Sequence, residues 1–157
     1  NTTLMKTKNG RTVMLQFDTH TGRPYSRLNT VTGTKAVHQG YPSRLYVGHE
    51  ELQWGHRWLS DDEYKEYREK YDHPLYKRVV EASKGSGHGG MDGIMAYRIL
   101  ECLQKGLPLD QNVYEGCFWS AVSPLSEVSV AQGGMPQAFP DFTRGQWKKT
   151  APLAIIS

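Results

Sequence analysis

"KGSGHGGMDG", residues 84–93, decides between two fold classes, because Gly85, Gly87 and Gly90 satisfy the pattern G-x-G-x-x-G of dinucleotide-binding folds. In those folds a strand runs into the glycines, a helix leaves them and an acidic residue follows about 20 residues later. The residues before Gly85, "VVEASK", are instead typical of the end of a helix. Asp110 lies 20 residues after Gly90, but it follows the helix terminator "KGLPL" and no second parallel strand. The glycine pattern is therefore accidental, and we expect no dinucleotide site in this loop.

The first third of the chain predicts β-structure. The runs "TTLMKTK" (2–8) and "RTVMLQFDT" (11–19) flank Asn9-Gly10, which is a strong hairpin signal. In the second run Val13, Leu15 and Phe17 alternate with Thr12, Met14 and Gln16, so one face of the hairpin is expected to seek a core. Three shorter strands are expected over 25–33, 34–39 and 43–48, the last two divided by "GYP". Consecutive antiparallel strands of this kind form a sheet with one face that needs cover.

The second half predicts helices that supply this cover. Caps, breakers and apolar periodicity place them over 61–71, 74–84, 92–104 and 113–132. Ser60 and Glu63 have the spacing of a capping box, and Asn112 can cap the last helix. Pro124 should kink that last helix, because it lacks an N–H group and its ring crowds the carbonyl of Ser120.

Caps and glycines also define the two central helices. Pro74 suits the first turn of its helix, which Gly85 is expected to end. Asp92 begins the next helix, whose apolar stripe of Met95, Ile99, Cys102 and Leu103 ends before Gly106. The tail from residue 133 is expected to be an extended strap with aromatic anchors. Strands first and helices second predict an α+β fold, an open antiparallel or mixed β-sheet with helices packed on one face.

Length and charge narrow the class of protein. The 157 residues suggest one domain, and a hydrophobic content of 38% with 22% charged residues is ordinary for a globular protein. The net charge of +3 is small, and basic and acidic residues alternate, which argues against nucleic-acid binding. No apolar run approaches the roughly 20 residues that span a bilayer, so no membrane partner is expected. The opening "NTTLMKTKNG" starts inside a strand-like pattern, as a piece of a longer protein would.

Cysteine and histidine spacing gives little support for a metal site. Cys102 and Cys117 lie 15 residues apart without a partnering histidine, and we expect both to be small buried residues. The stretch "HEELQWGHRW" (49–58) contains two histidines and two glutamates near Trp54 and Trp58, and a surface loop held by tryptophan packing is favoured there over a zinc site. The motifs of serine and cysteine hydrolases, P-loops and conventional paired carboxylates are also missing from the sequence.

Two residues remain as candidates for binding. His88 lies inside the glycine run, with Asp92 four residues later at a helix start. Asp92 can be a simple N-cap with His88 exposed, or the loop can face a ligand with His88 hydrogen-bonding or exchanging protons near neutral pH. Tyr25 lies between Arg23 and Arg27 at the expected start of a strand. This aromatic and basic edge is compatible with packing and with contact to a sugar or carboxylate.

A set of segments resembles, in order, the C-terminal part of glycoside hydrolase family 109, a branch of the Gfo/Idh/MocA oxidoreductase superfamily. The segments are "TTLMKTKNGRTVMLQ", "RPYSR", "GTKAV", "GHGGMD", "LQKGLPLDQNVYEG", "WSAVSPLSEVSVA" and "PDFTRGQW". The resemblance covers nearly the whole chain, and the combination of "GHGGMD" with "PLSEVSVA" and "PDFTRG" is specific to it.

The resemblance implies that residues 1–157 are a single C-terminal substrate and oligomerisation domain, and that an N-terminal Rossmann domain holding NAD precedes it in the parent protein. It implies an α-N-acetylgalactosaminidase in which a sugar hydroxyl at C3 is oxidised, the aglycone is eliminated, water adds and the hydride returns. The implied partners are a carbohydrate with terminal N-acetylgalactosamine or a similar sugar, the missing Rossmann domain, and further copies of the chain through the open face of the sheet. Export or a periplasmic location in a bacterium is also implied.

The resemblance assigns site residues sparingly. Tyr25 matches a position that contacts the sugar, and His88 is carried over as a second substrate-binding residue. The cofactor loop and the catalytic tyrosine and histidine of the family would precede Asn1, so no catalytic, cofactor-binding or metal-binding residue is expected here. Two alternatives stay open: the C-terminal domain of a sugar dehydrogenase with net NAD reduction, and a sugar-binding or oligomerising module without chemistry.

Overall fold

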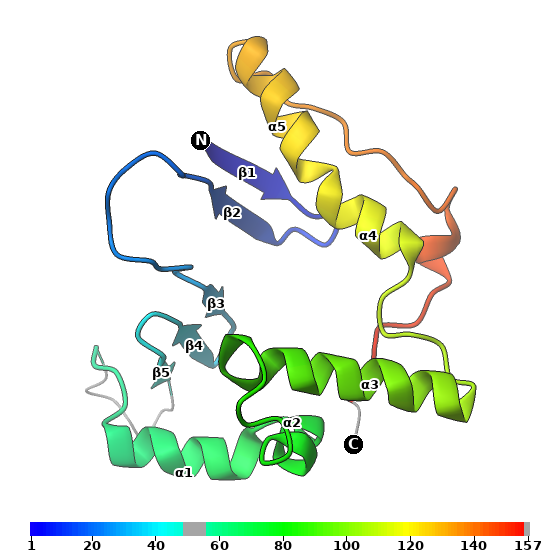
Figure 1. Cartoon of the computed structure of the whole chain (residues 1–157). Coiled ribbons are helices and arrows are strands. Elements are labelled where there is room, and N and C mark those ends of the chain that lie inside the picture. The colour runs from blue at the N-terminus through cyan, green and yellow to red at the C-terminus, as the bar shows by residue number, and fades with distance from the viewer. Residues whose placement is uncertain (49–55, 156–157) are drawn as a thin grey trace. The chain divides into compact units, whose positions relative to one another are not determined.

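A computed structural model describes residues 1–48 and 56–155 (Figure 1). The chain divides into two compact units. We call Asn1–Asp18 together with Arg78–Ser157 the hairpin unit, and Thr19–Lys77 the three-strand unit. Each unit is described by itself below. Both combine antiparallel strands with helices, so the α+β class predicted from the sequence is confirmed, with the strands in two sheets.

The hairpin unit begins with the hairpin that Asn9-Gly10 predicts. Strands β1 (Thr2–Lys6) and β2 (Thr12–Gln16) pair antiparallel. The N–H of Thr7 donates to the carbonyl of Arg11 at 2.8 Å, and the N–H of Gly10 donates to that of Thr7 at 3.0 Å. Gly10 has φ 79, the left-handed conformation that closes a three-residue loop with a bulge. The hairpin is therefore local in origin.

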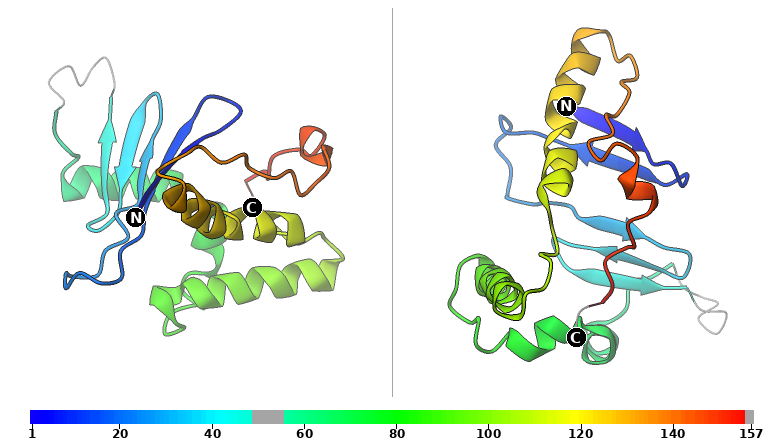
Figure 2. Two further views of the ribbon diagram at one scale, coloured as in Figure 1. Left: turned by 90° about the horizontal axis from the view of Figure 1, so that it is seen from above. Right: turned by 90° about the vertical axis from the view of Figure 1, so that its right-hand side faces the viewer.

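One face of this hairpin lies against a helix. The register pairs Thr3 with Leu15 and Met5 with Val13, so these four side chains share a face. The hydroxyl of Thr3 is 2.8 Å from that of Ser126 in helix α5 (Val122–Ala131), and Figure 2 shows β1 and β2 beside α4 and α5. The expectation that Val13, Leu15 and Phe17 face a core is wrong in this structure, since every residue of β2 is exposed and Phe17 is 68% exposed. In β1, Thr3 and Met5 are half-buried. Self-association through the open face stays a prediction.

The helices of the hairpin unit follow the predicted caps closely. The side chain of Asn112 accepts hydrogen bonds from the N–H groups of Tyr114 and Glu115, and Glu115 reaches back to the N–H of Asn112, so α4 (Val113–Ser120) begins with a full capping box. Helix α3 (Met91–Lys105) ends at Gly106, which has φ 64. The single helix predicted over 113–132 is wrong: α4 and α5 meet at Ala121, three residues before Pro124. The proline lacks the N–H group that a continuous helix would use.

The end of α2 and the start of α3 differ from the predictions. Helix α2 (Pro74–Val79) ends before residue 84, and turns follow it over residues 80–85. Within them, the N–H of Ser83 is shared between the carbonyls of Val79 and Val80. Helix α3 begins at Met91 behind Gly90, which has φ 101 and no capping side chain. The prediction that Asp92 caps this helix is therefore wrong, since its carboxylate bonds to His88 instead.

The tail is an extended strap with aromatic anchors, as expected. Phe139 packs on Phe118 of α4 with ring centroids 4.8 Å apart. Further along, the carboxylate of Asp141 accepts from Thr143, from the N–H of Gly145 and from the indole of Trp147, next to the short 3-10 helix η3 (Gln146–Lys148). These hydrogen bonds lower the pKa of Asp141, with that from the Thr143 side chain contributing most. One carboxylate thus organises the whole "DFTRGQW" turn.

The three-strand unit contains β3 (Thr30–Thr32), β4 (Ala36–Gln39) and β5 (Arg44–Val47) in that order, all antiparallel. Helix α1 (Asp61–Tyr71) begins with the predicted capping box of Ser60 and Glu63. The strand predicted over 25–33 is wrong before residue 30. Leu28 has φ 43 and its N–H donates to the hydroxyl of Ser26, so the chain leaves the extended conformation there.

No helix within residues 1–48 and 56–155 combines the length and the apolar character that crossing a membrane requires.

Candidate functional site

Tyr25 presents an accessible aromatic ring in the three-strand unit. Its side chain is 74% exposed, and the ring of Tyr41 meets it in an edge-on arrangement with centroids 5.9 Å apart. The Nε of Arg27 donates to the phenol oxygen of Tyr25 at 2.6 Å, and this bond raises the pKa of Arg27. Because the phenol oxygen accepts from Arg27, its own proton is available to donate outward. The group offers a flat ring and a directed O–H to a ligand.

His88 lies in the glycine loop of the hairpin unit, where a hydrogen bond to Asp92 holds its ring. The loop contains the short 3-10 helix η2 (His88–Gly90), followed at once by α3. The Nδ1 of His88 lies 3.0 Å from both carboxylate oxygens of Asp92, while the His88 side chain remains 65% exposed. His88 thus combines a fixed ring with access to solvent.

The structure does not bring Tyr25 and His88 into one described site, since they belong to different units. Their roles in substrate binding stay predictions. Of the stretch 49–58, His49, Glu50, Glu51 and Trp54 lie outside the described residues. Trp58 packs under the guanidinium of Arg44 at 4.3 Å, and His56 is exposed. Within the described ranges, no three His, Cys, Asp or Glu side chains gather as a metal site would require.

The two cysteines differ in their surroundings. Cys102 in α3 is fully buried, which confirms its role as a small core residue. The same prediction for Cys117 is wrong, because Cys117 lies on α4, a helix without a buried residue, and is exposed.

The glycine loop also lacks the geometry of a cofactor site. It follows a helical turn and not a strand, and every strand pair in the described chain is antiparallel. The N–H of Asp92 donates to the carbonyl of Gly87 and that of Gly93 to the hydroxyl of Ser86, so both are already used. The carboxylate of Asp92 in the first turn of α3 would also repel a pyrophosphate. The residues of this loop therefore do not fit NAD.

We expect the 157-residue chain not to bind NAD measurably, because the N–H groups of Gly90, Asp92 and Gly93 are satisfied within the loop and the carboxylate of Asp92 would repel a phosphate. Isothermal titration calorimetry with NAD tests this directly. A dissociation constant in the micromolar range would contradict our interpretation of residues 84–93.

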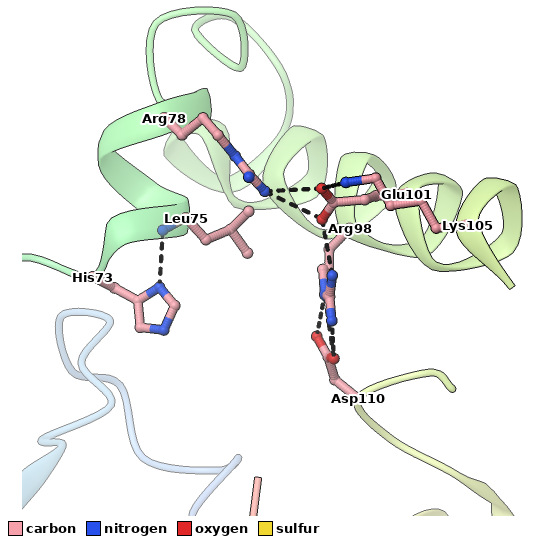
Figure 3. A network of polar contacts seen from close by, with 7 residues as sticks. All are labelled: His73, Leu75, Arg78, Arg98, Glu101, Lys105 and Asp110. Carbon is pink, nitrogen blue, oxygen red and sulfur yellow. Dashed lines mark hydrogen bonds and ion pairs between the residues drawn. The ribbon is translucent and has the colours of Figure 1, made fainter. Parts of the chain in front are cut away.

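A charged network that the sequence analysis missed holds the core of the hairpin unit. Glu101 is 7% exposed, and its carboxylate accepts from Arg78 at 3.1 Å, Arg98 at 2.8 Å and Lys105 at 2.8 Å (Figure 3). Arg98 also makes a two-pronged ion pair with Asp110, both bonds at 2.9 Å. The bonds from Lys105 and Arg98 lower the pKa of Glu101 to about 2. The network ties the end of α2 and the loop before α4 to α3.

A groove of about 450 Å³ lies in the three-strand unit, between the strands β4 and β5 and helix α1. Ala36, His38, Leu45 and Val47 share the sheet face that lines it, as their register requires. At its edge, His38 Nε2 is 3.0 Å from the hydroxyl of Ser43, which is 2.8 Å from that of Tyr64. The sequence predicted neither the groove nor these hydrogen bonds. The residues that form them come from β4, from the segment before β5 and from α1, which are separate in the sequence.

Comparison with known proteins shows which family the sequence of this chain matches. The model described as "Glycosyl hydrolase 109, C-terminal domain" matches residues 1–149. Two Akkermansia muciniphila proteins named glycosyl hydrolase family 109 protein 1 and protein 2 are 57% and 53% identical to this chain, over 99% and 100% of its length. A Shewanella amazonensis glycosyl hydrolase family 109 protein is 50% identical over 99% of the chain. These matches cover 33–34% of the relatives, so the chain spans about a third of the length of the curated relatives it matches.

Proposed function

This chain belongs to glycosyl hydrolase family 109, as its C-terminal domain, and from that membership we propose that the full-length protein removes terminal α-linked N-acetylgalactosamine from glycans. The observation that carries the proposal is the match of the family model over residues 1–149. NAD, held by the part of the protein outside this chain, would supply a reversible hydride acceptor. The net reaction would be hydrolysis without net redox.

In this proposal the chain itself contributes substrate contacts. The exposed ring of Tyr25 would stack on the apolar face of the sugar, with its O–H donating to a sugar oxygen, since its oxygen already accepts from Arg27. His88 would present its outer nitrogen to a sugar hydroxyl, because its inner nitrogen is occupied by Asp92. Each contact would by itself help to orient a sugar, and the chemistry would be left to the part of the protein outside this chain.

The proposed activity can be tested on the full-length protein with a chromogenic α-N-acetylgalactosaminide and NAD. We expect release of the chromophore and of free sugar without accumulation of NADH. Oxidation of the free sugar with stoichiometric NADH would support a dehydrogenase instead. A sugar-binding module would show neither reaction.

We expect Tyr25→Phe in the full-length protein to lower kcat/KM about three- to tenfold, because it removes one substrate hydrogen bond and keeps the ring. Steady-state kinetics on the same glycoside measures this. The matched control is Tyr71→Phe, which alters another exposed tyrosine on α1, 65% exposed, and should leave kcat/KM unchanged. Equal rates for Tyr25→Phe and the unmodified enzyme would mean that Tyr25 is a packing residue.

A further inference from the structure

The side chains of His88 and Asp92 form a close contact on the surface of the hairpin unit. Both Asp92 oxygens lie 3.0 Å from the same ring nitrogen, Nδ1, so the carboxylate straddles it. The other nitrogen, Nε2, makes no hydrogen bond to any residue in the described part of the chain, and the ring is 65% exposed. One nitrogen is therefore fixed by the protein and the other is open to a ligand.

The backbone is shaped to make this contact. His88, Gly89 and Gly90 have φ values of 56, 69 and 101, three consecutive left-handed residues. A histidine in this region is uncommon, and such conformations persist where the surrounding structure requires them. Here the reversal turns the His88 side chain back toward Asp92, in the first turn of α3.

Gly87 makes room for the carboxylate. A Cβ atom on Gly87 would lie 2.3 Å from Oδ2 of Asp92, closer than two atoms can approach without moving. The backbone of Gly87 has φ −56 and ψ 159, which any residue adopts. The absence of a side chain at position 87 is thus explained by the place of Asp92 and not by backbone strain.

The chemistry of the pair fixes the tautomer of His88. The N-terminus of a helix stabilises negative charge, and an ionised carboxylate can only accept hydrogen bonds. Nδ1 must therefore carry the proton, and Nε2 of the neutral ring is left with its lone pair. A nitrogen in that state accepts a hydrogen bond from a hydroxyl group.

We propose that Asp92 is a positioning residue that holds His88 as the Nδ1–H tautomer, so that Nε2 accepts a hydrogen bond from a substrate hydroxyl. The substrate part of this inference rests on the proposed function; the tautomer does not. The loop "GHGGMD" then has one physical purpose: its glycines allow the turn and the close approach that bring the carboxylate under the ring.

The tautomer can be read from the ring nitrogen shifts of the 157-residue chain, labelled with ¹⁵N-histidine, at alkaline pH. The His88 signals are identified by their loss in His88→Gln. We expect Nδ1–H in the unmodified chain and a shift to mainly Nε2–H in Asp92→Ala. Gly87→Ala, which displaces the carboxylate without removing it, should shift the tautomer the same way.

The control is Asp62→Ala, which removes an acidic residue from the first turn of α1 and should leave the His88 signals unchanged. An Nε2–H tautomer in the unmodified chain would overturn the proposal. So would a tautomer that is the same with and without Asp92.

Kinetics of the full-length protein test the role in binding. We expect Asp92→Ala to lower kcat/KM about tenfold, close to the loss in His88→Ala, since an Nε2–H ring cannot accept the bond. In the His88→Ala background, Asp92→Ala should cost nothing further, because residues that act as a unit are not additive. Additive losses would show that Asp92 acts independently of His88 and would overturn the positioning role. If the unmodified full-length protein releases no sugar, the proposed function fails, and the tautomer experiment still decides the role of Asp92.

Discussion

Glu101→Gln is expected to lower the midpoint of thermal unfolding by about 5 °C or more, because it leaves a cluster of cations without its central anion. The carboxylate is 7% exposed and accepts hydrogen bonds from Arg78, Arg98 and Lys105. Glutamine has the same shape but only one acceptor oxygen, and its NH₂ group would face cationic donors. Lys105 is 59% exposed and can turn to solvent, which limits the loss. Arg98 is 15% exposed and cannot do so as easily.

Circular dichroism melting curves of the chain measure this effect. The matched control is Glu127→Gln on α5, an exposed glutamate, for which we expect a change within about 1 °C. Equal midpoints for the two variants would mean that water satisfies the cations around position 101 as well as the carboxylate does.

The same carboxylate gives a pH dependence with a defined sign. Lys105 and Arg98 lower the pKa of Glu101 from its ordinary 4.5 to about 2. A carboxyl group with a lowered pKa contributes stability above its unfolded value, and this contribution is lost as the pH falls through the folded value. The difference between the unmodified chain and Glu101→Gln should therefore be full above pH 4.5 and shrink between pH 4.5 and 2. A difference that is constant over this window would contradict the assignment.

The features that could be predicted from the sequence are those encoded within one turn of chain. Ser60 with Glu63, and Asn112 with Glu115, satisfy each other's N–H groups across three residues, so the helix starts follow from the letters alone. The Asn9-Gly10 turn is local in the same way. Pro124 predicted a kink, but the sequence could not tell a bent helix from two helices that meet at Ala121.

Contacts between segments that are distant in the chain could not be predicted from the sequence. Arg98, Glu101 and Lys105 have the i,i+3 and i,i+4 spacing of a helix face, yet Arg78 joins them from 23 residues upstream in another helix. The strand expected from Tyr25 fails at Leu28, whose left-handed conformation is supported by neighbouring side chains and contradicts the β-pattern of its own segment.

The surroundings of the two candidate residues could not be predicted from the sequence, and their roles in substrate binding stay predictions. Tyr25 and His88 were candidates from their local sequence and from the family resemblance. For Asp92, a helix cap, a common role of an aspartate at a helix start, was one of two alternatives. A left-handed histidine cannot be recognised from sequence, and it is this conformation at residue 88 that redirects Asp92 from the helix backbone to the ring.

The same substitution, glycine to alanine, at Gly93 in α3 and at Gly116 in α4 tests how closely the loop over residues 83–90 packs against α3. A Cβ atom on Gly93 would lie 2.7 Å from the hydroxyl oxygen of Ser86 and 3.0 Å from Cβ of Ser83, a residue that is 5% exposed. A Cβ atom on Gly116 in α4 would meet nothing within 4 Å. Both glycines are helical, so alanine gains the same helix propensity at each, about 0.5–1 kcal/mol.

Gly93→Ala should therefore destabilise the chain and Gly116→Ala should stabilise it, with about 2 kcal/mol between the two in the free energy of unfolding. At Gly93 the new methyl group expels the hydroxyl of Ser86, which donates to the carbonyl of Ser83 at 2.7 Å and accepts from the N–H of Gly93 at 3.0 Å. Ser83 cannot retreat, because it is already buried. Urea unfolding of the two variants, which have the same amino-acid composition, measures the difference in the free energy of unfolding. Stabilisation of both by the same amount would mean that the loop before α3 yields freely, and the fixed geometry of the His88 and Asp92 pair would then lose its support.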